Sequence, residues 1–208
     1  MSNLQTNLRQ YYIDECISFR KTNEEFGGLS NMASGYPIVV NNIYIRTSEA
    51  LYQAIRYPDY PEIQKEIIKQ KSPMAAKMVS KKYRKEKTRV DWDLKRVAIM
   101  KWCLRVKLIQ NKDTFGELLL KTDNKDIVEE SKKDKFWGAK RLDDEILEGT
   151  NALGRLLMEL REIYKNYKLE KIEPLKIENF KLYGDFIKDV VPIEDKEIFK
   201  EKDKGSLF

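Results

Sequence analysis

Hydrophobic and polar positions alternate in two ways along the chain, with short apolar runs in the first quarter and helical spacing afterwards. Between Cys16 and Thr47, short apolar pieces are separated by glycine, proline and asparagine, a pattern typical of strands and turns. Asn41 and Asn42 stand between two such pieces, so they predict a β-hairpin.

Helical spacing begins at Thr47, which with Ser48 is a candidate cap, and it ends at Pro58. Within this stretch Leu51 and Ile55 recur on one side. Similar patterns predict further helices over residues 61–70, from residue 73 onward, and over 91–110, 114–122 and 151–167. Residues 126–131 predict a strand, and residues 133–149 predict a loop.

The helix predicted over residues 151–167 has the most regular apolar stripe, and we expect it to be buried at the centre of the fold. The stripe consists of Leu153, Leu156, Leu157, Leu160, Ile163, Tyr164 and Tyr167. Beyond residue 168 the pattern weakens. These patterns predict a mainly α fold with a small β element, in one compact multihelical domain over residues 1–170. Residues 171–208 are expected to be an extension that packs back through Phe180, Tyr183, Phe186 and Ile187.

Composition makes this a chain that can bury a core, because 41% of its 208 residues are hydrophobic. The net charge of +6 is compatible with phosphate-bearing ligands. The densest basic run, residues 81–87, is expected to be a solvated surface. The start of the chain lacks the apolar core of a signal peptide, and no run of about 20 apolar residues exists. We therefore expect a cytoplasmic protein with no membrane partner.

The absence of histidine restricts the available chemistry. It excludes Ser–His and Cys–His dyads and histidine metal ligands. Cys16 and Cys103 cannot form a cysteine zinc site, and Cys103 is expected in the core. The glycines form neither a P-loop nor a dinucleotide fingerprint. The proton chemistry of an enzyme would then come mainly from Asp, Glu, Lys or Tyr. This favours reactions that two carboxylates can catalyse, of which glycosidic bond cleavage is the main example. We expect neither a metal ion nor a cofactor.

Four short segments carry the candidate chemistry, and each also has a structural interpretation. A glutamate such as Glu49 near a helix start complements the helix dipole by roughly 0.3–1 kcal/mol. Asparagines such as Asn31 and Asn151 are ordinary turn and cap residues. Trp137 beside a glycine is more often a packing residue. The segments are "FGGLSN" (26–31), "TSEALYQA" (47–54), "KDKFWG" (133–138) and "NALGRLLMELR" (151–161).

Together, these segments resemble the NADAR superfamily, the YbiA-like N-glycosidases. "FGGLSNM", "TSEALYQA", "SPMAAK", "DWD", "FWG" and "NALGRLLMELR" occur in the order seen in that family, over about residues 17–167. The resemblance implies a YbiA-like fold and cleavage of the bond between ribose C1 and a nitrogen. Known members of the family split phosphoribosylated pyrimidine intermediates of riboflavin biosynthesis, and others remove ADP-ribose from modified guanine in nucleic acid.

The resemblance also implies a set of site residues. Glu49 becomes the key carboxylate and Asp134 its partner, while Trp137 lines the site. The implied and neighbouring substrate contacts are Phe19, Arg20, Phe26, Ser30, Asn31, Tyr52, Gln53, Arg56, Lys77, Trp137, Gly138 and Asn151. Among these, the amides suit ribose hydroxyls, the aromatic rings suit the base, and the basic side chains suit phosphate.

This sequence departs from the family pattern in two places. Many members have an aromatic residue after the position of Phe19, where this chain has Arg20. Many members carry several glycines where this chain has the charged segment 139–148. Two rival hypotheses remain. The first is that the chain is a nucleotide- or ADP-ribose-binding module without turnover. The second is that it is the version of the enzyme that acts on ADP-ribosylated nucleic acid rather than on a small molecule.

Overall fold

The computed structural model describes residues 8–193, and the chain divides into two compact units. The first unit comprises Met1–Ser30 and Phe115–Tyr167. The second unit comprises Asn31–Thr114 and Lys168–Phe208. Each unit is described by itself. No helix in the described range is long and apolar enough to cross a membrane.

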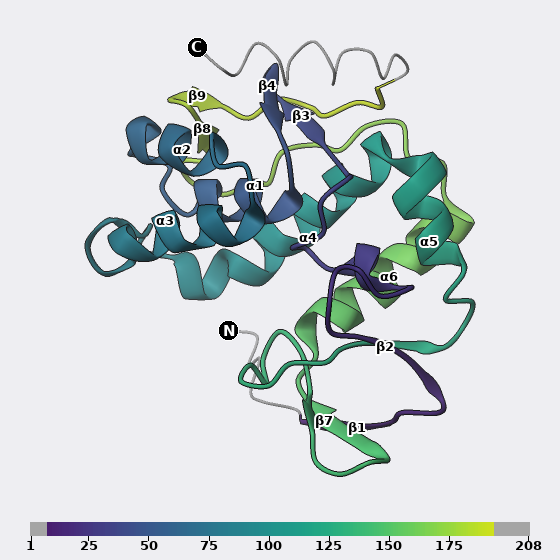
Figure 1. Cartoon of the computed structure of the whole chain (residues 1–208). Helices are drawn as coiled ribbons and strands as arrows, with labels where there is room; N and C mark the ends of the chain where they lie inside the picture. Colours follow the sequence, from purple (N-terminus) through teal and green to yellow (C-terminus); the bar gives the residue numbers. More distant parts are fainter. Residues whose placement is uncertain (1–7, 194–208) are drawn as a thin grey trace. The chain divides into compact units, whose positions relative to one another are not determined.

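The first unit combines two small sheets with a long helix, α6 (Figure 1). One sheet is antiparallel with the strand order β1-β7-β6, and in the other β2 and β5 run parallel. The elements are β1 (Arg9–Tyr12), β2 (Cys16–Phe19), the short helix η1 (Gly27–Leu29), α5 (Glu117–Leu120), β5 (Asp126–Glu129), β6 (Lys140–Arg141), β7 (Ile146–Gly149) and α6 (Ala152–Asn166).

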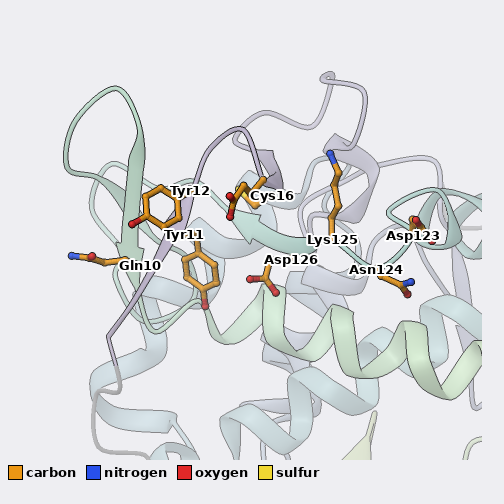
Figure 2. A pocket seen from close by; sticks show the side chains of 9 residues that line it. Gln10, Tyr11, Tyr12, Cys16, Asp123, Asn124, Lys125 and Asp126 are labelled. Carbon is orange, nitrogen blue, oxygen red and sulfur yellow. The ribbon is translucent and has the colours of Figure 1, made fainter.

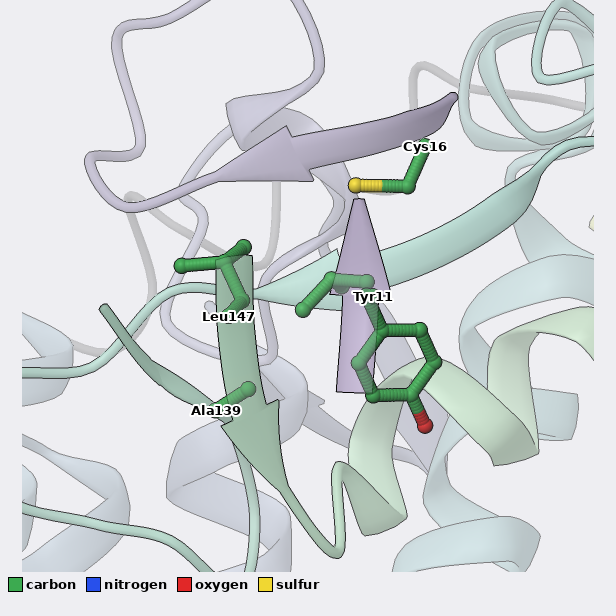
Figure 3. Packing of buried hydrophobic residues seen from close by; sticks show 5 residues of the cluster. Tyr11, Cys16, Ala139 and Leu147 are labelled. Atoms are coloured by element: carbon green, nitrogen blue, oxygen red, sulfur yellow. The ribbon is translucent and has the colours of Figure 1, made fainter. Parts of the chain in front are cut away.

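A small apolar cluster joins the two sheets of the first unit (Figure 3). It consists of Tyr11, Cys16, Val128, Ala139 and Leu147, all of them buried. Four of these residues come from strands of the two sheets, and Ala139 immediately precedes β6. Their burial contributes to the stability of these short strands, because isolated hairpins are only marginally stable in water.

Helix α6 packs closely against β5. A Cβ atom on Gly154 would lie 2.0 Å from the carbonyl oxygen of Ile127, so only glycine allows this approach. Leu153, Leu157 and Leu160 of the predicted stripe are buried, but Tyr167 is 69% exposed. The inclusion of Tyr167 in the stripe was wrong, because the helix ends at Asn166 and the chain is extended at Tyr167.

The second unit contains most of the helices (Figure 1). Its elements are β3 (Ile38–Val40), β4 (Ile43–Ile45), α1 (Ser48–Ile55), α2 (Pro61–Ile68), α3 (Pro73–Lys87), α4 (Trp92–Gln110), β8 (Lys181–Leu182) and β9 (Asp185–Phe186). A π-helical turn, Lys112–Gly116, precedes α5. The hairpin at Asn41 and Asn42 is confirmed, since both residues have the positive φ that a two-residue turn needs.

Helix α1 is the central element of the second unit. All eight of its residues are buried, and it contacts α2, α3 and α4. The Thr47 side chain caps it by accepting the backbone N–H of Ala50 at 3.2 Å. Cys103, from α4, is fully buried, as expected for a core side chain.

Residues 168–193 belong to the second unit through hydrogen bonds to its helices. Trp102 Nε1 donates to the carbonyl of Glu173 at 2.9 Å, and Gln64 Nε2 donates to that of Lys181 at 3.0 Å. Phe180 and Ile187 pack as predicted, but Phe186 is 64% exposed. The prediction for Phe186 was wrong because its ring lies at the surface beneath the ammonium group of Lys181. The limits 1–170 and 171–208 stay a prediction.

The loop predicted over residues 133–149 was also wrong, because it contains β6 and β7. Three of its charged side chains form ion pairs: Arg141 with Glu130 at 3.2 Å, and Lys135 with Glu148 at 2.7 Å. The predicted strand at 126–131 is present as β5. Helices are the larger part of the described fold, and the strands are more numerous than one small β element.

Leu157→Ala tests the packing of α6. Leu157 is fully buried, so we expect the free energy of unfolding to fall by about 2–5 kcal/mol. Leu142→Ala is the matched control, since Leu142 is 49% exposed, and it should change the value by less than about 0.5 kcal/mol. Urea unfolding followed by circular dichroism measures both, and equal losses would contradict the placement of Leu157.

Candidate active site

The centre of the candidate site is the Glu49 carboxylate, which is held by two amides in the second unit. Glu49 Oε2 accepts from Asn31 Nδ2 at 2.7 Å, and Oε1 accepts from Gln53 Nε2 at 2.8 Å. All three residues are buried. Glu49, Tyr52 and Gln53 therefore do not form a solvated helix face. A carboxylate that accepts a hydrogen bond at each of its two oxygens has a fixed orientation.

Asn31 is itself fixed to the start of α1. Its carbonyl oxygen accepts the backbone N–H of Glu49 and the hydroxyl of Ser48, both at 3.2 Å. Its side-chain oxygen Oδ1 is buried and has no hydrogen-bond partner in the described part of the chain. An unpaired buried acceptor is costly, so it marks a position where a ligand hydroxyl can bind.

A second layer of hydrogen bonds orients Gln53. Its Oε1 accepts from Ser80 Oγ at 2.6 Å and from Arg84 Nη2 at 3.3 Å. The hydroxyl of Tyr57 in turn donates to the carbonyl of Ser80 at 2.5 Å. Since the oxygen of the Gln53 amide is taken by these donors, its NH₂ group must face Glu49.

An aromatic and cationic cluster lies at the other end of α1. The guanidinium of Arg56 lies 3.9 Å from the centre of the Trp92 ring, which also packs 5.0 Å from Tyr52. Burial, and then the positive charge of Arg84, lower the pKa of Arg56. The Nε atoms of both arginines are buried without a hydrogen-bond partner within residues 8–193. Two cations with free donors suit an anionic group such as phosphate.

The hydroxyl of Tyr52 stays protonated at neutral pH. Burial raises its pKa well above the usual value, and the nearby charge of Glu49 adds to the shift. Tyr52 can therefore donate a hydrogen bond, but it cannot act as a general base at neutral pH.

Of the predicted site residues, the structure brings together Asn31, Glu49, Tyr52, Gln53 and Arg56 in the second unit. Lys77 belongs to the same unit but is exposed on α3. Eight others belong to the first unit: Phe19, Arg20, Phe26, Ser30, Asp134, Trp137, Gly138 and Asn151.

Asp134 and its neighbours form a tight turn in the first unit. Asp134 Oδ1 accepts the backbone N–H groups of Phe136 and Trp137 at 2.8 and 2.9 Å. The Trp137 ring is partly exposed and packs edge-on against Phe136 at 5.1 Å. Gly138 is required here, because a Cβ atom would lie 2.3 Å from the carbonyl oxygen of Glu129. A catalytic role of Asp134 stays a prediction.

Asn151 has a structural role that the cap interpretation missed. Its φ of 49° is left-handed, and its side chain makes no capping bond. Instead Nδ2 donates to the carbonyl of Ile127 at 2.8 Å, and Oδ1 accepts the N–H of Glu129 at 3.2 Å. Asn151 therefore ties the start of α6 to β5.

The remaining predicted residues of the first unit vary in exposure. Phe19 and Ser30 are buried, and Phe26 is partly buried. Arg20 is exposed and lies 3.8 Å from Glu130. Contact of these side chains with a substrate stays a prediction.

Sequence reasoning missed Ser80 and Arg84. Both lie on α3, one turn apart, and Arg84 belongs to the basic run that was expected to be solvated. A signal was present: Ala76, Val79 and Ser80 share the buried face of this helix, and Arg84 follows Ser80 by four residues.

A pocket of about 570 Å³ in the first unit contains none of the predicted site residues (Figure 2). It lies beside β1 and the start of β5, and Tyr11, Cys16 and Asp126 are among its lining residues. Burial, and then the charge of Asp126, raise the pKa of the Cys16 thiol to about 11. The thiol is therefore protonated at neutral pH, and it is a poor nucleophile.

The geometry of the second unit defines a class of site. A buried, oriented carboxylate lies in one network with an unpaired acceptor, and two arginines lie near it. Such an arrangement is compatible with hydrolytic chemistry that stabilises positive charge on a polar, anionic substrate.

Comparison with known proteins gives the family. The family model described as "NADAR domain" matches residues 18–165. The chain is 35% identical over 149 residues to N-glycosidase YbiA of Escherichia coli K12, covering 72% of this chain and 88% of the relative. It is 32% identical over 156 residues to N-glycosidase Npun_R5314 of Nostoc punctiforme, covering 72% and 93%.

A solved structure agrees with the sequence comparison. The NMR structure of the E. coli protein YbiA superposes with a TM-score of 0.63 at 33% identity, covering 75% of this chain and 90% of that one. The chain therefore belongs to the NADAR family and has a YbiA-like fold. It is an enzyme of the N-glycosidase type, which argues against a binding module without turnover.

Ser80→Ala tests the second layer. The change leaves the buried Gln53 oxygen without its shortest hydrogen bond, so we expect the free energy of unfolding to fall by about 1–3 kcal/mol. Ser34→Ala, at an exposed position of the same unit, is the control and should stay within about 0.5 kcal/mol of the wild type. If Ser80→Ala behaves like Ser34→Ala in urea unfolding, the proposed layer does not hold Gln53.

Proposed function

We propose that the protein hydrolyses the bond between ribose C1 and a base nitrogen in a phosphorylated ribosyl or ADP-ribosyl substrate. The observation that carries the proposal is the Glu49 carboxylate, buried and fixed by Asn31 and Gln53. Breaking a ribosyl C–N bond builds positive charge on the sugar, and a fixed carboxylate in a buried site stabilises that charge without reorganising.

The step balances with water as the only co-reactant. The C1–N bond breaks and its electron pair leaves with the base nitrogen, which takes up a proton. Water adds its oxygen to C1 and gives its own proton to a carboxylate. The products are the free base and either a ribosyl phosphate or ADP-ribose, according to the substrate. Glu49 is our candidate for stabilising the sugar or orienting the water, and Asp134 is our candidate for the second carboxylate.

Other residues take binding roles in this proposal. The unpaired Oδ1 of Asn31 accepts a ribose hydroxyl. Arg56 contacts phosphate, and so does Lys77 or Arg20. Trp137 stacks on the base, Phe19 and Phe26 form an aromatic wall, and Asn151 completes the site. These last assignments are supported by the family resemblance.

The relatives' names favour one substrate class. The chain is 32% identical over 158 residues to the Riboflavin biosynthesis protein VVA0006 of Vibrio vulnificus, covering 75% of this chain and 40% of the relative. We therefore place phosphoribosylated pyrimidine intermediates first. ADP-ribose on guanine of nucleic acid is the second candidate, which the net charge of +6 favours.

A substrate panel tests the proposal. The protein is incubated with phosphoribosylated pyrimidines, NAD, ADP-ribose and ADP-ribosylated DNA, and released base and sugar are identified by liquid chromatography and mass spectrometry. We expect release of a base from at least one phosphorylated ribosyl compound. Folded protein that releases no base from any of them would contradict the proposal.

Asn31→Ala sharpens the test by means of deoxyribosyl analogues of the active substrate. The wild type should prefer the ribosyl compound, because its Asn31 acceptor stays unpaired with the analogue that lacks the matching hydroxyl. Asn31→Ala should lower kcat by about tenfold or more. It should also reduce the ratio of the rate with the ribosyl compound to the rate with its deoxyribosyl analogue. Asn166→Ala, at an exposed position, is the control. An unchanged preference in Asn31→Ala would remove Asn31 from the site.

A further inference from the structure

The positive charge of the chain is concentrated in one segment of the second unit. Residues 61–87 contain nine lysines and arginines and three glutamates, a net charge of +6. The whole chain also has a net charge of +6, so the rest of the sequence is balanced. This segment forms α2 and α3, which pack against each other.

The lysines of α3 form a stripe on its outer face. Lys77, Lys81 and Lys85 are exposed and follow one another at intervals of four residues. At a rise of 1.5 Å per residue, successive lysines of this stripe are about 6 Å apart along the helix axis. The inner face of the same helix carries Ser80 and Arg84, which contact Gln53. The lysine stripe and the Glu49 network therefore lie on different sides of α3.

A recess of about 540 Å³ lies between α2 and α3, and aromatic rings line it next to the basic residues. Tyr60 and Tyr83 line it, together with Lys65, Lys69 and Lys87. The hydroxyl of Tyr83 donates to Glu66 at 2.6 Å, which fixes the ring. The ammonium group of Lys87 lies 4.9 Å from the centre of the Tyr60 ring, so this ring presents a face to a cation.

We propose that the face formed by α2 and α3 binds single-stranded nucleic acid. Its lysines contact the phosphates, and unpaired bases stack on Tyr60 and Tyr83 in the recess. A duplex keeps its base faces covered, so rings in a recess favour a single strand. Two glutamates, Glu62 and Glu66, also line the recess, and Glu66 is already engaged by Tyr83 and by Lys82 at 3.7 Å. Binding at this face requires no turnover, so it is tested independently of the glycosidase reaction.

The test uses the full chain and a fluorescein-labelled 12-mer of thymidine, with binding followed by fluorescence anisotropy over a salt series. The double variant Lys81→Gln/Lys85→Gln should weaken binding by about tenfold at low salt. The slope of log K against log salt should become shallower by about 0.7 for each lost phosphate contact. Lys132→Gln/Lys133→Gln removes the same charge from exposed positions of the first unit, and it should change affinity by less than about twofold.

A tyrosine variant separates stacking from charge. Tyr60→Leu should weaken binding by about fivefold or more and leave the salt slope unchanged. Tyr12→Leu, at a residue that is 52% exposed in the first unit, should have no effect. The proposal is overturned if the two lysine pairs have equal effects, if Tyr60→Leu binds like the wild type, or if no oligonucleotide binds at low salt. It is also overturned if phosphatidylserine vesicles displace the oligonucleotide equally well from the wild type and from Tyr60→Leu. The surface would then bind anions through charge alone.

Discussion

The buried carboxylate of Glu49, held between the amides of Asn31 and Gln53, is the interaction on which the candidate site depends. Burying a carboxylate is costly unless its oxygens are hydrogen-bonded. Here the cost is offset by two short amide bonds, and Ser80 keeps Gln53 in place. Because α1 is buried along its whole length, the carboxylate has a rigid support. The proposed chemistry follows from this support, since preorganised charge needs no reorganisation during reaction.

Local sequence patterns were enough to predict most of the helices and the hairpin, because caps, prolines and apolar spacing act over a few residues. They did not reveal the burial of Glu49, since a polar residue becomes part of a core only when several helices surround it. They also missed β6 and β7. Strand β7 pairs with β1, which lies more than a hundred residues away in the sequence, and β6 pairs with β7. The second layer was missed for a related reason: Arg84 lies in a basic run, and only the packing of α3 on α1 turns it inward.

The segment in which this chain departs from its family has a clear structure. Residues 139–148 lack the glycines of many relatives and include β6 and most of β7. Within the first unit, Glu148 pairs with Lys135 and Arg141 pairs with Glu130. The family relationship therefore supports the type of reaction more strongly than the identity of the substrate. The basic face of α2 and α3 is a separate property of this sequence, and it has its own test.

The most direct test of the role of Glu49 is single-turnover base release by the wild type and by Glu49→Gln, at saturating substrate and on protein shown to be folded by circular dichroism. The substitution keeps the size of the side chain and removes its charge. If Glu49 stabilises the sugar or orients the water, Glu49→Gln should still bind substrate and should release base about a hundredfold more slowly, or slower still. If Glu49 only complements the helix dipole, stability should change by less than about 1 kcal/mol and the two rates should be equal. Equal rates would contradict the account.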